Sequence, residues 1–359
     1  MKIVFTVGDI NGIGFEVLLK ALSANPSWFQ KHSFSIVASS IIIQKLLEKY
    51  SNVWNKDICK YSENSIIINN NEKQKIEIIE IKNPIAKNFI KDFNSNGINS
   101  NKINIEFGQI TKEAGIIAYH SILEATKLTI NKNFDAIITL PISKKAIHLS
   151  EKSFVGHTEK ITELCEKKQS IMILFTDKLR VALATTHIPI YSVSRRITKK
   201  RLQTLIKNFC TVLKNDFGIE EPKIAVLGLN PHSSDNSMFG NEEEKIIIPA
   251  INVMQRKGIN VFGTFSSDGF FARKQYENFD GVIAMYHDQG LIPLKMLTSG
   301  GGVNFTACLP IVRTSPDHGT AFEIAGKNIA NANSMIDAIN SAIGIANNRA
   351  NKKTMINGG

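Results

Sequence analysis

The sequence predicts an α/β protein in which polar side chains gather at the carboxyl ends of buried strands. Apolar runs typical of strands alternate with amphipathic stretches typical of helices along most of the chain. Three of the apolar runs, VALATT, IAVLGLNP and GVIAMY, each end next to a histidine. The chain has 359 residues, more than one hydrophobic core usually supports, so we expect two domains of roughly 150 to 200 residues.

The histidines that follow these runs are His187, His232 and His287. In open α/β sheets, ligands bind outside the carboxyl ends of the strands, so the three imidazoles could converge there. Three neutral imidazoles with an open fourth position are typical of a catalytic site for a divalent metal. The sequence therefore predicts such a site.

The first part of the chain opens with a strand, a glycine-containing turn and a helix. Gly8, Gly12 and Gly14 permit a tight turn, but they do not match the G-x-G-x-x-G dinucleotide fingerprint. We interpret residues 51–104 as surface loops with one edge strand, KIEIIEI. The other expected elements are strands at 2–7, 34–39 and 135–141 and helices at 15–22, 40–50 and 111–130.

The chain is expected to cross into a second domain within SKKAIHLS, residues 143–150. There, FVGHTEKITEL predicts a helix that begins near Thr158 and ends near Glu166. His157 would lie beside the helix N-terminus, where free N–H groups favour anions, although it could equally well only cap the turn. Strands SIMILF and LRVALATTH follow, then a helix at 198–215, the acidic-ended helix NEEEKIIIPAI and a final helix at 334–347 with a frayed tail.

The segment GVIAMYHDQGLIPLK is central to the predicted site. Gly290 is expected to allow a turn, with Lys295 following at short range. Further along the chain, Asn304 and Arg313 carry side chains suited to phosphate.

Charge and composition favour a small anionic substrate over nucleic acid. The formal charge is +11 and the pI is about 9.3, but the basic residues are scattered and no aromatic platform is interleaved with them. No apolar stretch has the ~18 to 20 residues of a membrane span, and no signal peptide precedes the first strand. The four cysteines are far apart, which fits reduced thiols. We expect a cytoplasmic protein without nucleic-acid or membrane partners.

Seven motifs in order resemble the PdxA family of 4-hydroxythreonine-4-phosphate dehydrogenases. They are GDINGIGFE, TLPISKKAI, FVGHTE, LATTHIPI, LNPHSSDN, MYHDQGLIPLK and LPIVRTSPDHGTAFEIAGK, and the resemblance runs from residue 2 to about 348. Each motif is weak alone, but their joint occurrence in order is specific.

The resemblance implies a two-domain α/β/α sandwich related to the isocitrate and isopropylmalate dehydrogenases, with the active site in the interdomain cleft. The expected domains are 1–143 with 296–359, and a central domain, 144–295, that carries the three histidines. The family works as a homodimer with its active site at the subunit interface. Its reaction is the NAD(P)-dependent oxidation of 4-phosphooxy-L-threonine in pyridoxal phosphate biosynthesis.

The resemblance also implies roles for individual residues. His187, His232 and His287 match metal ligands, with zinc, magnesium or cobalt as the ion. Asp268, Asp288 and Lys295 match catalytic positions. His157, Thr158, Lys295, Asn304 and Arg313 match substrate contacts. The nicotinamide cofactor, NAD or NADP, rests on the resemblance alone, and we assign its contacts to Asp317, His318 and Gly319.

The chain departs from the family pattern in two loops. The usual GDPAGIGPE reads GDINGIGFE, and the usual NPHAGE reads NPHSSDN, so a glycine and an acidic residue beside His232 are changed. We expect the metal site to persist but the geometry of the second loop to differ.

Three other functions are considered. A paralogous enzyme that oxidises 4-phospho-D-erythronate or D-threonate would keep the same metal and phosphate groups. A metal-dependent phosphohydrolase would release phosphate without any change in nicotinamide absorbance. A basic nucleic-acid-binding module would bind in a strongly salt-dependent way, and only the net charge favours it.

Overall fold

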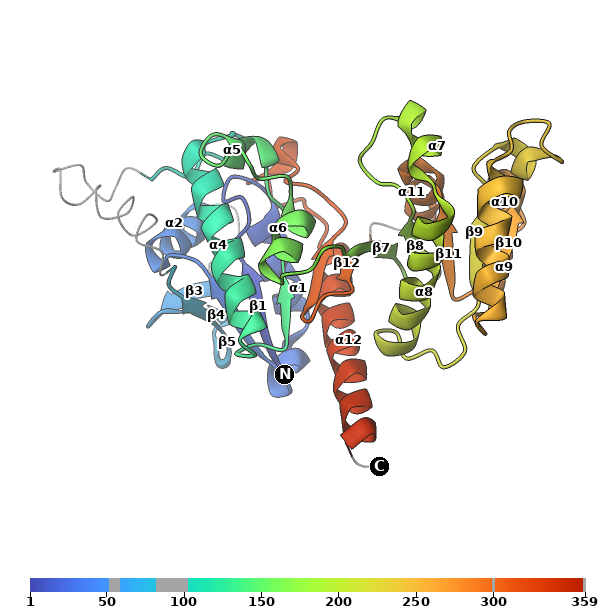
Figure 1. Cartoon of the computed structure of the whole chain (residues 1–359). Coiled ribbons are helices and arrows are strands. Elements are labelled where there is room, and N and C mark those ends of the chain that lie inside the picture. The colour runs from blue at the N-terminus through green and yellow to red at the C-terminus, as the bar shows by residue number, and fades with distance from the viewer. Residues whose placement is uncertain (52–58, 82–102, 299–300, 358–359) are drawn as a thin grey trace. The chain divides into compact units, whose positions relative to one another are not determined.

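The computed structural model describes residues 1–51, 59–81, 103–298 and 301–357, and the chain divides into two compact α/β units (Figure 1). The first unit contains Met1–Lys168 and Leu309–Ile343, and the second contains Gln169–Cys308 and Gly344–Gly359. The predicted α/β class is confirmed. No helix in the described part of the chain is long and apolar enough to span a membrane.

The strands of the first unit lie in the order β13-β6-β1-β2-β5-β4-β3. Strands β13, β6, β1, β2 and β5 are parallel, and the β3–β4 hairpin is antiparallel and extends the sheet beyond β5. KIEIIEI is therefore not an edge strand, because β5 pairs on both sides. The bounds are β1 (Lys2–Thr6), β2 (Ser33–Val37), β3 (Cys59–Ser62), β4 (Ser65–Ile68), β5 (Asn71–Ile79), β6 (Ala136–Ile138) and β13 (Val312–Pro316). The rest of the loop region predicted at 51–104 includes 52–58 and 82–102, which lie outside the described residues.

Helices cover the first unit's sheet, and the long helix α4 packs on one face of it (Figure 1). The Thr111 hydroxyl caps α4 by accepting from the Ala114 N–H, so the helix begins one residue after its predicted start. The helices are α1 (Gly14–Ala24), η1 (Pro26–Gln30), α2 (Ser40–Ser51), α4 (Lys112–Ile130), α5 (Lys144–His148), α6 (His157–Leu164) and η7 (Phe322–Ile324).

The compact units differ from the expected domains in where the chain crosses between them. Residues 144–168 belong to the first unit, because Ile147, Phe154 and Ile161 are buried in the same apolar cluster as α4. Residues 296–308 belong to the second unit because β12 (Val303–Ala307) pairs with β7 (Ile171–Phe175). Local composition near residue 143 did not reveal these non-local contacts.

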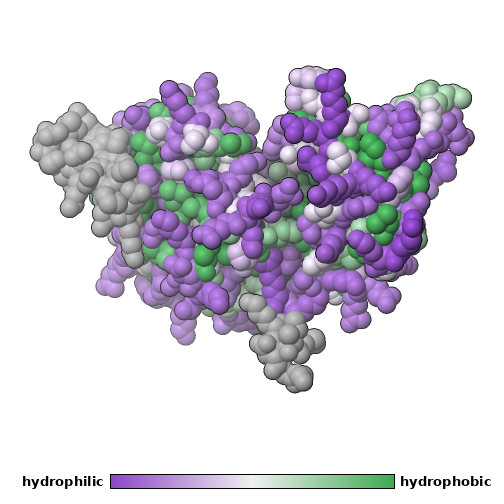
Figure 2. Space-filling view, in the orientation of Figure 1, coloured by the Kyte–Doolittle hydropathy of each residue, from purple (hydrophilic) through white to green (hydrophobic). Residues whose placement is uncertain are grey.

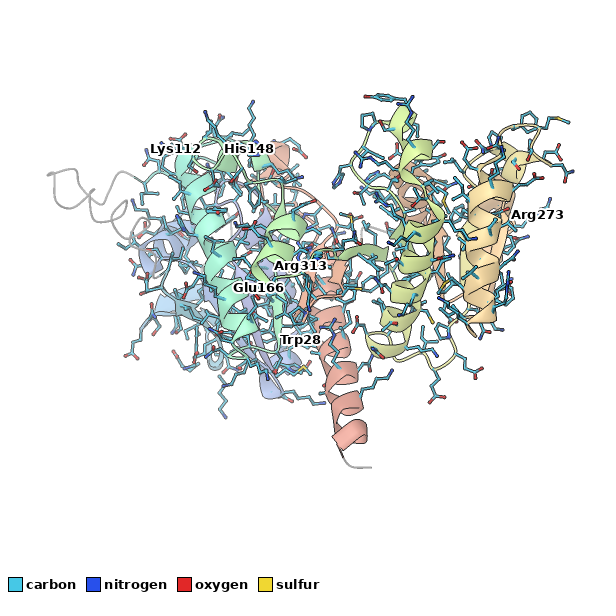
Figure 3. All side chains as sticks on the ribbon, viewed as in Figure 1. Trp28, Lys112, His148, Glu166, Arg273 and Arg313 are labelled. Carbon is cyan, nitrogen blue, oxygen red and sulfur yellow. The ribbon has the colours of Figure 1, made fainter. Side chains whose placement is uncertain are left out.

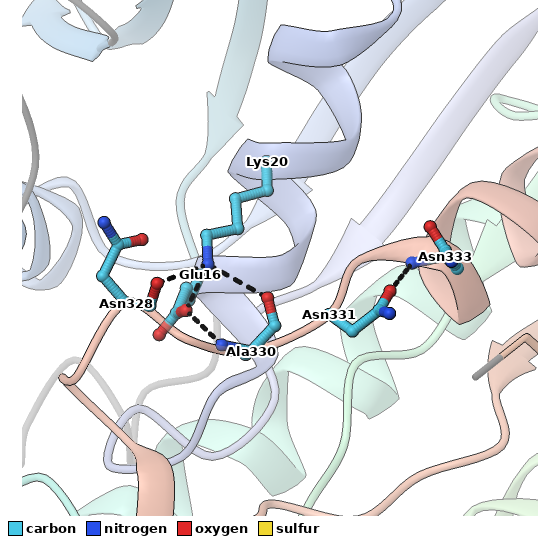
Figure 4. A network of polar contacts seen from close by, with 6 residues as sticks. All are labelled: Glu16, Lys20, Asn328, Ala330, Asn331 and Asn333. Carbon is cyan, nitrogen blue, oxygen red and sulfur yellow. Dashed lines mark hydrogen bonds and ion pairs between the residues drawn. The ribbon is translucent and has the colours of Figure 1, made fainter. Parts of the chain in front are cut away.

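Buried polar groups join the two ends of the first unit's chain. The fully buried Glu16 accepts from the Lys20 ammonium at 2.8 Å and from the Ala330 N–H at 3.0 Å (Figure 4). The same ammonium donates to the carbonyls of Asn328 and Ala330. Helix α1 is thus fastened to a segment more than 300 residues away in sequence.

The unusual loop GDINGIGFE is held by Asn11, which replaces the family's alanine. Its Nδ2 donates to the Gln109 carbonyl and the Thr111 hydroxyl, and its Oδ1 accepts from the Glu106 N–H at 2.9 Å. These three hydrogen bonds attach the loop to the segment that leads into α4.

The strands of the second unit lie in the order β10-β9-β11-β8-β7-β12. Strands β10, β9, β11 and β8 are parallel, so their carboxyl ends share one edge, and β7 and β12 are antiparallel to their neighbours. The remaining bounds are β8 (Arg180–Leu183), β9 (Ile224–Leu227), β10 (Val261–Phe265) and β11 (Gly281–Ala284).

Helices α10 and α11 pack on one face of this sheet through Phe270, Leu291 and Leu294. Gly290 lies inside α11 and does not form the predicted turn. A glycine is needed there because a Cβ would lie 2.6 Å from Val181 Cγ1. The unit's helices are η3 (Ile190–Ser192), α7 (Val193–Arg196), α8 (Lys199–Asn215), η4 (Pro231–Ser234), η5 (Glu243–Ile247), α9 (Ile248–Arg256), α10 (Ser267–Ala272), η6 (Gln275–Asn278) and α11 (His287–Leu297).

The last helix, α12 (Asn333–Asn357), is longer than predicted, and the tail expected to fray continues it. Its later part binds to the second unit. Arg349 pairs with the buried carboxylate of Asp216 at 2.7 Å, and Asn348 donates to the Asp216 carbonyl. These bonds attach the later part of α12 to the second unit.

Candidate active site

The second unit brings His187 and His287 together. Strands β8 and β11 pair in parallel, with Leu183 opposite Ala284, so the residues that follow them emerge side by side. The Thr185 hydroxyl donates to the Met285 carbonyl at 2.6 Å and extends this pairing beyond the strands. The two imidazole ring centroids are 5.8 Å apart.

Asp288 orients the imidazole of His287. Its Oδ1 lies 2.7 Å from Nδ1 of that ring, which leaves Nε2 to face outward as a ligand atom. A carboxylate on one ring nitrogen is the usual arrangement around a metal-binding histidine, because it fixes the tautomer and raises the basicity of the other nitrogen. Asp288 is itself exposed.

His232 follows β9, the strand that pairs with β11. It begins a run of left-handed backbone conformations that continues to Ser237, and its ring lies 6.1 Å from that of Phe239. Non-glycine residues avoid this conformation at a cost of about 1–2 kcal/mol each where it is repeated. The run coincides with the loop NPHSSDN, where the sequence departs from the family.

Two of the three predicted metal ligands, His187 and His287, lie side by side, and the convergence of all three stays a prediction. Among the described residues, no group of three or more His, Cys, Asp or Glu side chains lies close enough to hold a metal ion. The donor chemistry fits a divalent cation, because two imidazoles lie side by side and one is held by a carboxylate. The third imidazole belongs to the next strand in the sheet, since β9 pairs with β11.

Asp268 lies near His232 at the start of α10. Its pKa is lowered, first by the hydrogen bond from the Ser266 hydroxyl, then by the Gly269 N–H and by His232. The carboxylate is exposed and ionised, so it can support a cation or a protonated imidazole at this end of the sheet.

Lys295 and Asn304 also belong to the second unit. Lys295 is exposed near the end of α11 and presents a cation to solvent. Asn304 lies in β12, and its Oδ1 is buried with no hydrogen-bond partner among the described groups. A buried amide oxygen normally has a partner, so this atom is available to a ligand.

Arg313 lies in β13 of the first unit and is 2% exposed (Figure 3). Its Nε and one terminal nitrogen donate to the Thr139 hydroxyl at 3.1 and 2.5 Å. Burial lowers the pKa of the guanidinium to about 9, and the Glu159 carboxylate offsets part of that effect. Thr139 holds one side of the guanidinium, as expected of a preformed receptor for an anion.

His157 and Thr158 form the first turn of α6. The Nε2 of His157 is buried and has no hydrogen-bond partner in the described structure. Burial lowers the pKa of His157 well below 6.5, and the charges of Arg313 and Lys144 lower it further. The imidazole is therefore neutral at pH 7 and can offer one hydrogen bond to a bound molecule.

Sequence reasoning missed two groups beside these residues. Thr139 could have been found from the sequence, because it places a hydroxyl inside the apolar run DAIITLP. Lys144 is exposed at the start of α5, yet its ammonium lies 3.3 Å from where a Cβ on Gly156 would be. Only the fold brings it next to the turn that precedes His157.

The residues assigned to the nicotinamide cofactor lie between β13 and η7. The Asp317 N–H donates to the Ser334 hydroxyl, and Nδ1 of His318 lies 3.0 Å from the Gly319 carbonyl. Nε2 of His318 is buried with no described partner, and the pKa of that ring is lowered by burial. Gly319 has open space where a side chain would be, which fits a surface approached by a ligand.

Comparison with known proteins identifies the family. The family model for the pyridoxal phosphate biosynthetic protein PdxA matches residues 35–342. The chain belongs to the PdxA family. The resemblance carried by the motifs is thereby confirmed over most of the chain.

Similar proteins cover nearly the whole chain. The 4-hydroxythreonine-4-phosphate dehydrogenase of Sulfurihydrogenibium sp. is 41% identical over 346 residues, which are 96% of this chain and 98% of that protein. The crystal structure of the enzyme of that name from Klebsiella pneumoniae superposes with a TM-score of 0.77 at 33% identity, covering 96% of this chain and 99% of that one. The D-threonate 4-phosphate dehydrogenase of Salmonella typhimurium is 41% identical, but over 67% of this chain and 74% of that protein.

Proposed function

We propose that this protein oxidises 4-phosphooxy-L-threonine with NAD or NADP to 2-amino-3-oxo-4-phosphooxybutanoate. The product then decarboxylates to 3-amino-2-oxopropyl phosphate, in the biosynthesis of pyridoxal 5′-phosphate. The observation that carries this proposal is the 41% identity over nearly full length to a 4-hydroxythreonine-4-phosphate dehydrogenase. Membership of the family supports an oxidoreductase in this pathway.

The anionic part of the substrate is assigned to Arg313, His157 and Thr158 in the first unit, with Lys295 and Asn304 from the second. A buried guanidinium already fixed by Thr139 loses little freedom when it binds a phosphate, and charge-assisted hydrogen bonds there are strong. The neutral His157 can donate one more bond from Nε2 without adding charge.

His187, His232 and His287 are the residues that would hold a divalent ion, zinc, magnesium or cobalt. When bound, such an ion lowers the pKa of a coordinated hydroxyl and polarises a carbonyl. Asp288 keeps His287 in one tautomer, and Asp268 supplies negative charge near His232. These two carboxylates and the Lys295 ammonium are the catalytic assignments.

Asp317, His318 and Gly319 are assigned to the nicotinamide cofactor, which accepts the hydride. The buried Nε2 of His318 and the open surface over Gly319 support contact with a polar ligand. A homodimer with its active site at the subunit interface and a cytoplasmic location complete the proposal.

The test is oxidation of 4-phosphooxy-L-threonine by the metal-loaded protein, followed by the absorbance of reduced nicotinamide. We expect reduction of NAD or NADP that is lost in His232→Ala. Phosphate release without reduction would contradict the proposal and favour a phosphohydrolase.

A second candidate is oxidation of D-threonate 4-phosphate, which the similarity to the Salmonella typhimurium enzyme favours. This substrate and 4-phospho-D-erythronate are compared in the same assay. If one of these two compounds is oxidised and 4-phosphooxy-L-threonine is not, the fold and metal assignments are kept but the assigned pathway is wrong.

A further inference from the structure

Gln289 makes a hydrogen bond to each of three separate segments of the second unit. Its Oε1 accepts from the Met285 N–H at 2.7 Å. Its Nε2 donates to the Gly228 carbonyl and to the Ser267 hydroxyl, both at 2.7 Å. The side chain is buried, 9% exposed, and lies in the first turn of α11.

The three partners belong to the segments that carry the candidate site residues. Met285 ends the run that leads to His287, Gly228 follows β9 and precedes His232, and Ser267 is the neighbour of Asp268. The Gln289 side chain is thus hydrogen-bonded to the segments that follow β9 and β10 and to the end of the run that contains β11. These segments lead to His232, Asp268 and His287.

Only an amide of this length satisfies all three contacts. The oxygen is identified by the backbone N–H of Met285, which can bond only to an acceptor, so the nitrogen must face Gly228 and Ser267. A glutamate would turn two donors into acceptors and place a negative charge against a carbonyl. A methionine would fill the space but leave the Met285 N–H and the Gly228 carbonyl without partners, which is costly in a buried position.

We propose that Gln289 is a positioning residue that fixes the spacing of the His232, Asp268 and His287 loops. It touches neither substrate nor cofactor and acts through those three segments. This inference rests on the proposed function, because it concerns the same metal-binding and catalytic residues. No other buried side chain described here is shared in this way by the three strand ends.

The test compares Gln289→Glu with the wild-type protein by zinc and cobalt titration of the full chain against a competing chelator. We expect metal affinity to fall about 10- to 100-fold, the range typical when a residue that orients metal ligands is removed. kcat should fall by a similar factor, since a small misplacement of reacting groups slows catalysis. KM for the phosphorylated substrate should change less, because Arg313 and His157 belong to the other unit.

Two control variants separate positioning from general stability. Gln255→Glu makes the same chemical change at a residue whose Nε2 donates to the Val261 carbonyl, at the opposite end of β10. Arg349→Met destabilises the second unit by breaking the Asp216 ion pair, without touching the loops. Both controls should keep wild-type metal affinity.

Hydrogen exchange at the Met285 amide gives a readout that does not depend on activity. Gln289→Met should fold, lose protection at that amide and bind metal at least tenfold more weakly. If Gln289→Glu fails to fold, this second variant decides the question. The proposal is overturned if either folded variant binds metal and turns over within twofold of wild type. Wild-type protein that neither binds metal nor oxidises substrate would instead refute the proposed function.

Discussion

The guanidinium of Arg313 is the most deeply buried charge among the candidate site residues, and its pKa is lowered to about 9 because burial outweighs the opposing effect of the Glu159 carboxylate. A protein keeps such a group at a cost in stability, so its presence indicates a binding role. We expect Arg313→Met to raise KM for the phosphorylated substrate about 10- to 100-fold, as loss of a charge-assisted hydrogen bond of ~1.5–3 kcal/mol implies.

The same variant should unfold no more easily than wild type, because the cost of burying a charge is removed. Steady-state kinetics and urea unfolding of one preparation check both points. An unchanged KM with a large loss of stability would make Arg313 a structural residue.

Asp9 predicts how stability varies with pH. Burial raises its pKa from 3.8 to about 6, although hydrogen bonds from the Asn11 and Ser143 N–H groups lower it. The folded state therefore holds the proton more tightly than the unfolded state. The contribution of protonated Asp9 to the stability of the folded state is fully present below pH 3.8 and is lost as the pH rises through about 6.

Asp9→Asn should remove this dependence. The rise in pKa corresponds to about 3 kcal/mol, at ~1.4 kcal/mol per pH unit. The quantity to compare is the unfolding free energy of the variant minus that of the wild type. We expect this difference to be more positive at pH 7 than at pH 4 by an amount of that order. Urea unfolding at the two pH values measures it, and parallel curves for the two proteins would contradict the assignment.

Among the elements, α11 shows how packing overrides a local signal. Gly290→Ala would place a Cβ 2.6 Å from Val181 Cγ1 and 3.0 Å from Ala284 Cβ. We expect a loss of about 1–3 kcal/mol in unfolding free energy, typical of overpacking. In a Val181→Ala background the same substitution should cost less.

Gly344 provides the matched control, since it is an exposed helical glycine in α12 with nothing near its missing Cβ. Gly344→Ala should stabilise by up to about 1 kcal/mol through helix propensity. Equal effects at the two glycines would show that space around residue 290 is not the determinant.

The ion pair between Arg349 of α12 and Asp216 at the end of α8 is expected to contribute more to the unfolding free energy than the pairs on the surface. Asp216 is buried, so Arg349→Met leaves an uncompensated carboxylate and should cost about 3–5 kcal/mol. Lys60→Met breaks an exposed pair with Glu72 and should cost less than about 1 kcal/mol. Chemical unfolding of both variants tests the contrast.

The sequence predicted strands and the histidine pair well, because an apolar run followed by a polar residue is a local pattern. It did not predict the left-handed run from His232 to Ser237, since serine, aspartate and asparagine do not specify one. It also misjudged Gly290, where the reason for glycine is a neighbouring strand. The error at Gly290 concerns a contact between residues distant in sequence, which no local pattern contains.

For the whole molecule, the site residues are distributed over two units. His157 and Arg313 belong to the first, and the three histidines belong to the second. We expect inorganic phosphate to slow hydrogen exchange around β13 and α6, and zinc to slow it around the carboxyl ends of β8 and β11.

Chelation should abolish the zinc effect and the oxidation of substrate while leaving phosphate protection in place. Mass spectrometry of exchange with each ligand alone makes the comparison. Zinc protection confined to the first unit would contradict the histidine assignment.

Polar side chains cover much of the visible surface (Figure 2). The face seen in Figure 2 is mostly hydrophilic, with small apolar areas between polar side chains. The formal charge of +11 is carried by lysines and arginines scattered along the sequence. Such a surface suits attraction of an anionic metabolite through long-range steering.

The bonds of Glu16 and Lys20 to Asn328 and Ala330 have a consequence for synthesis on the ribosome. The first unit lacks β13 and these partners until the chain is almost complete, and the second lacks Arg349 until later still. Domains usually fold as they emerge, in order of synthesis. Neither unit can therefore complete these contacts until residues 312–349 have left the exit tunnel.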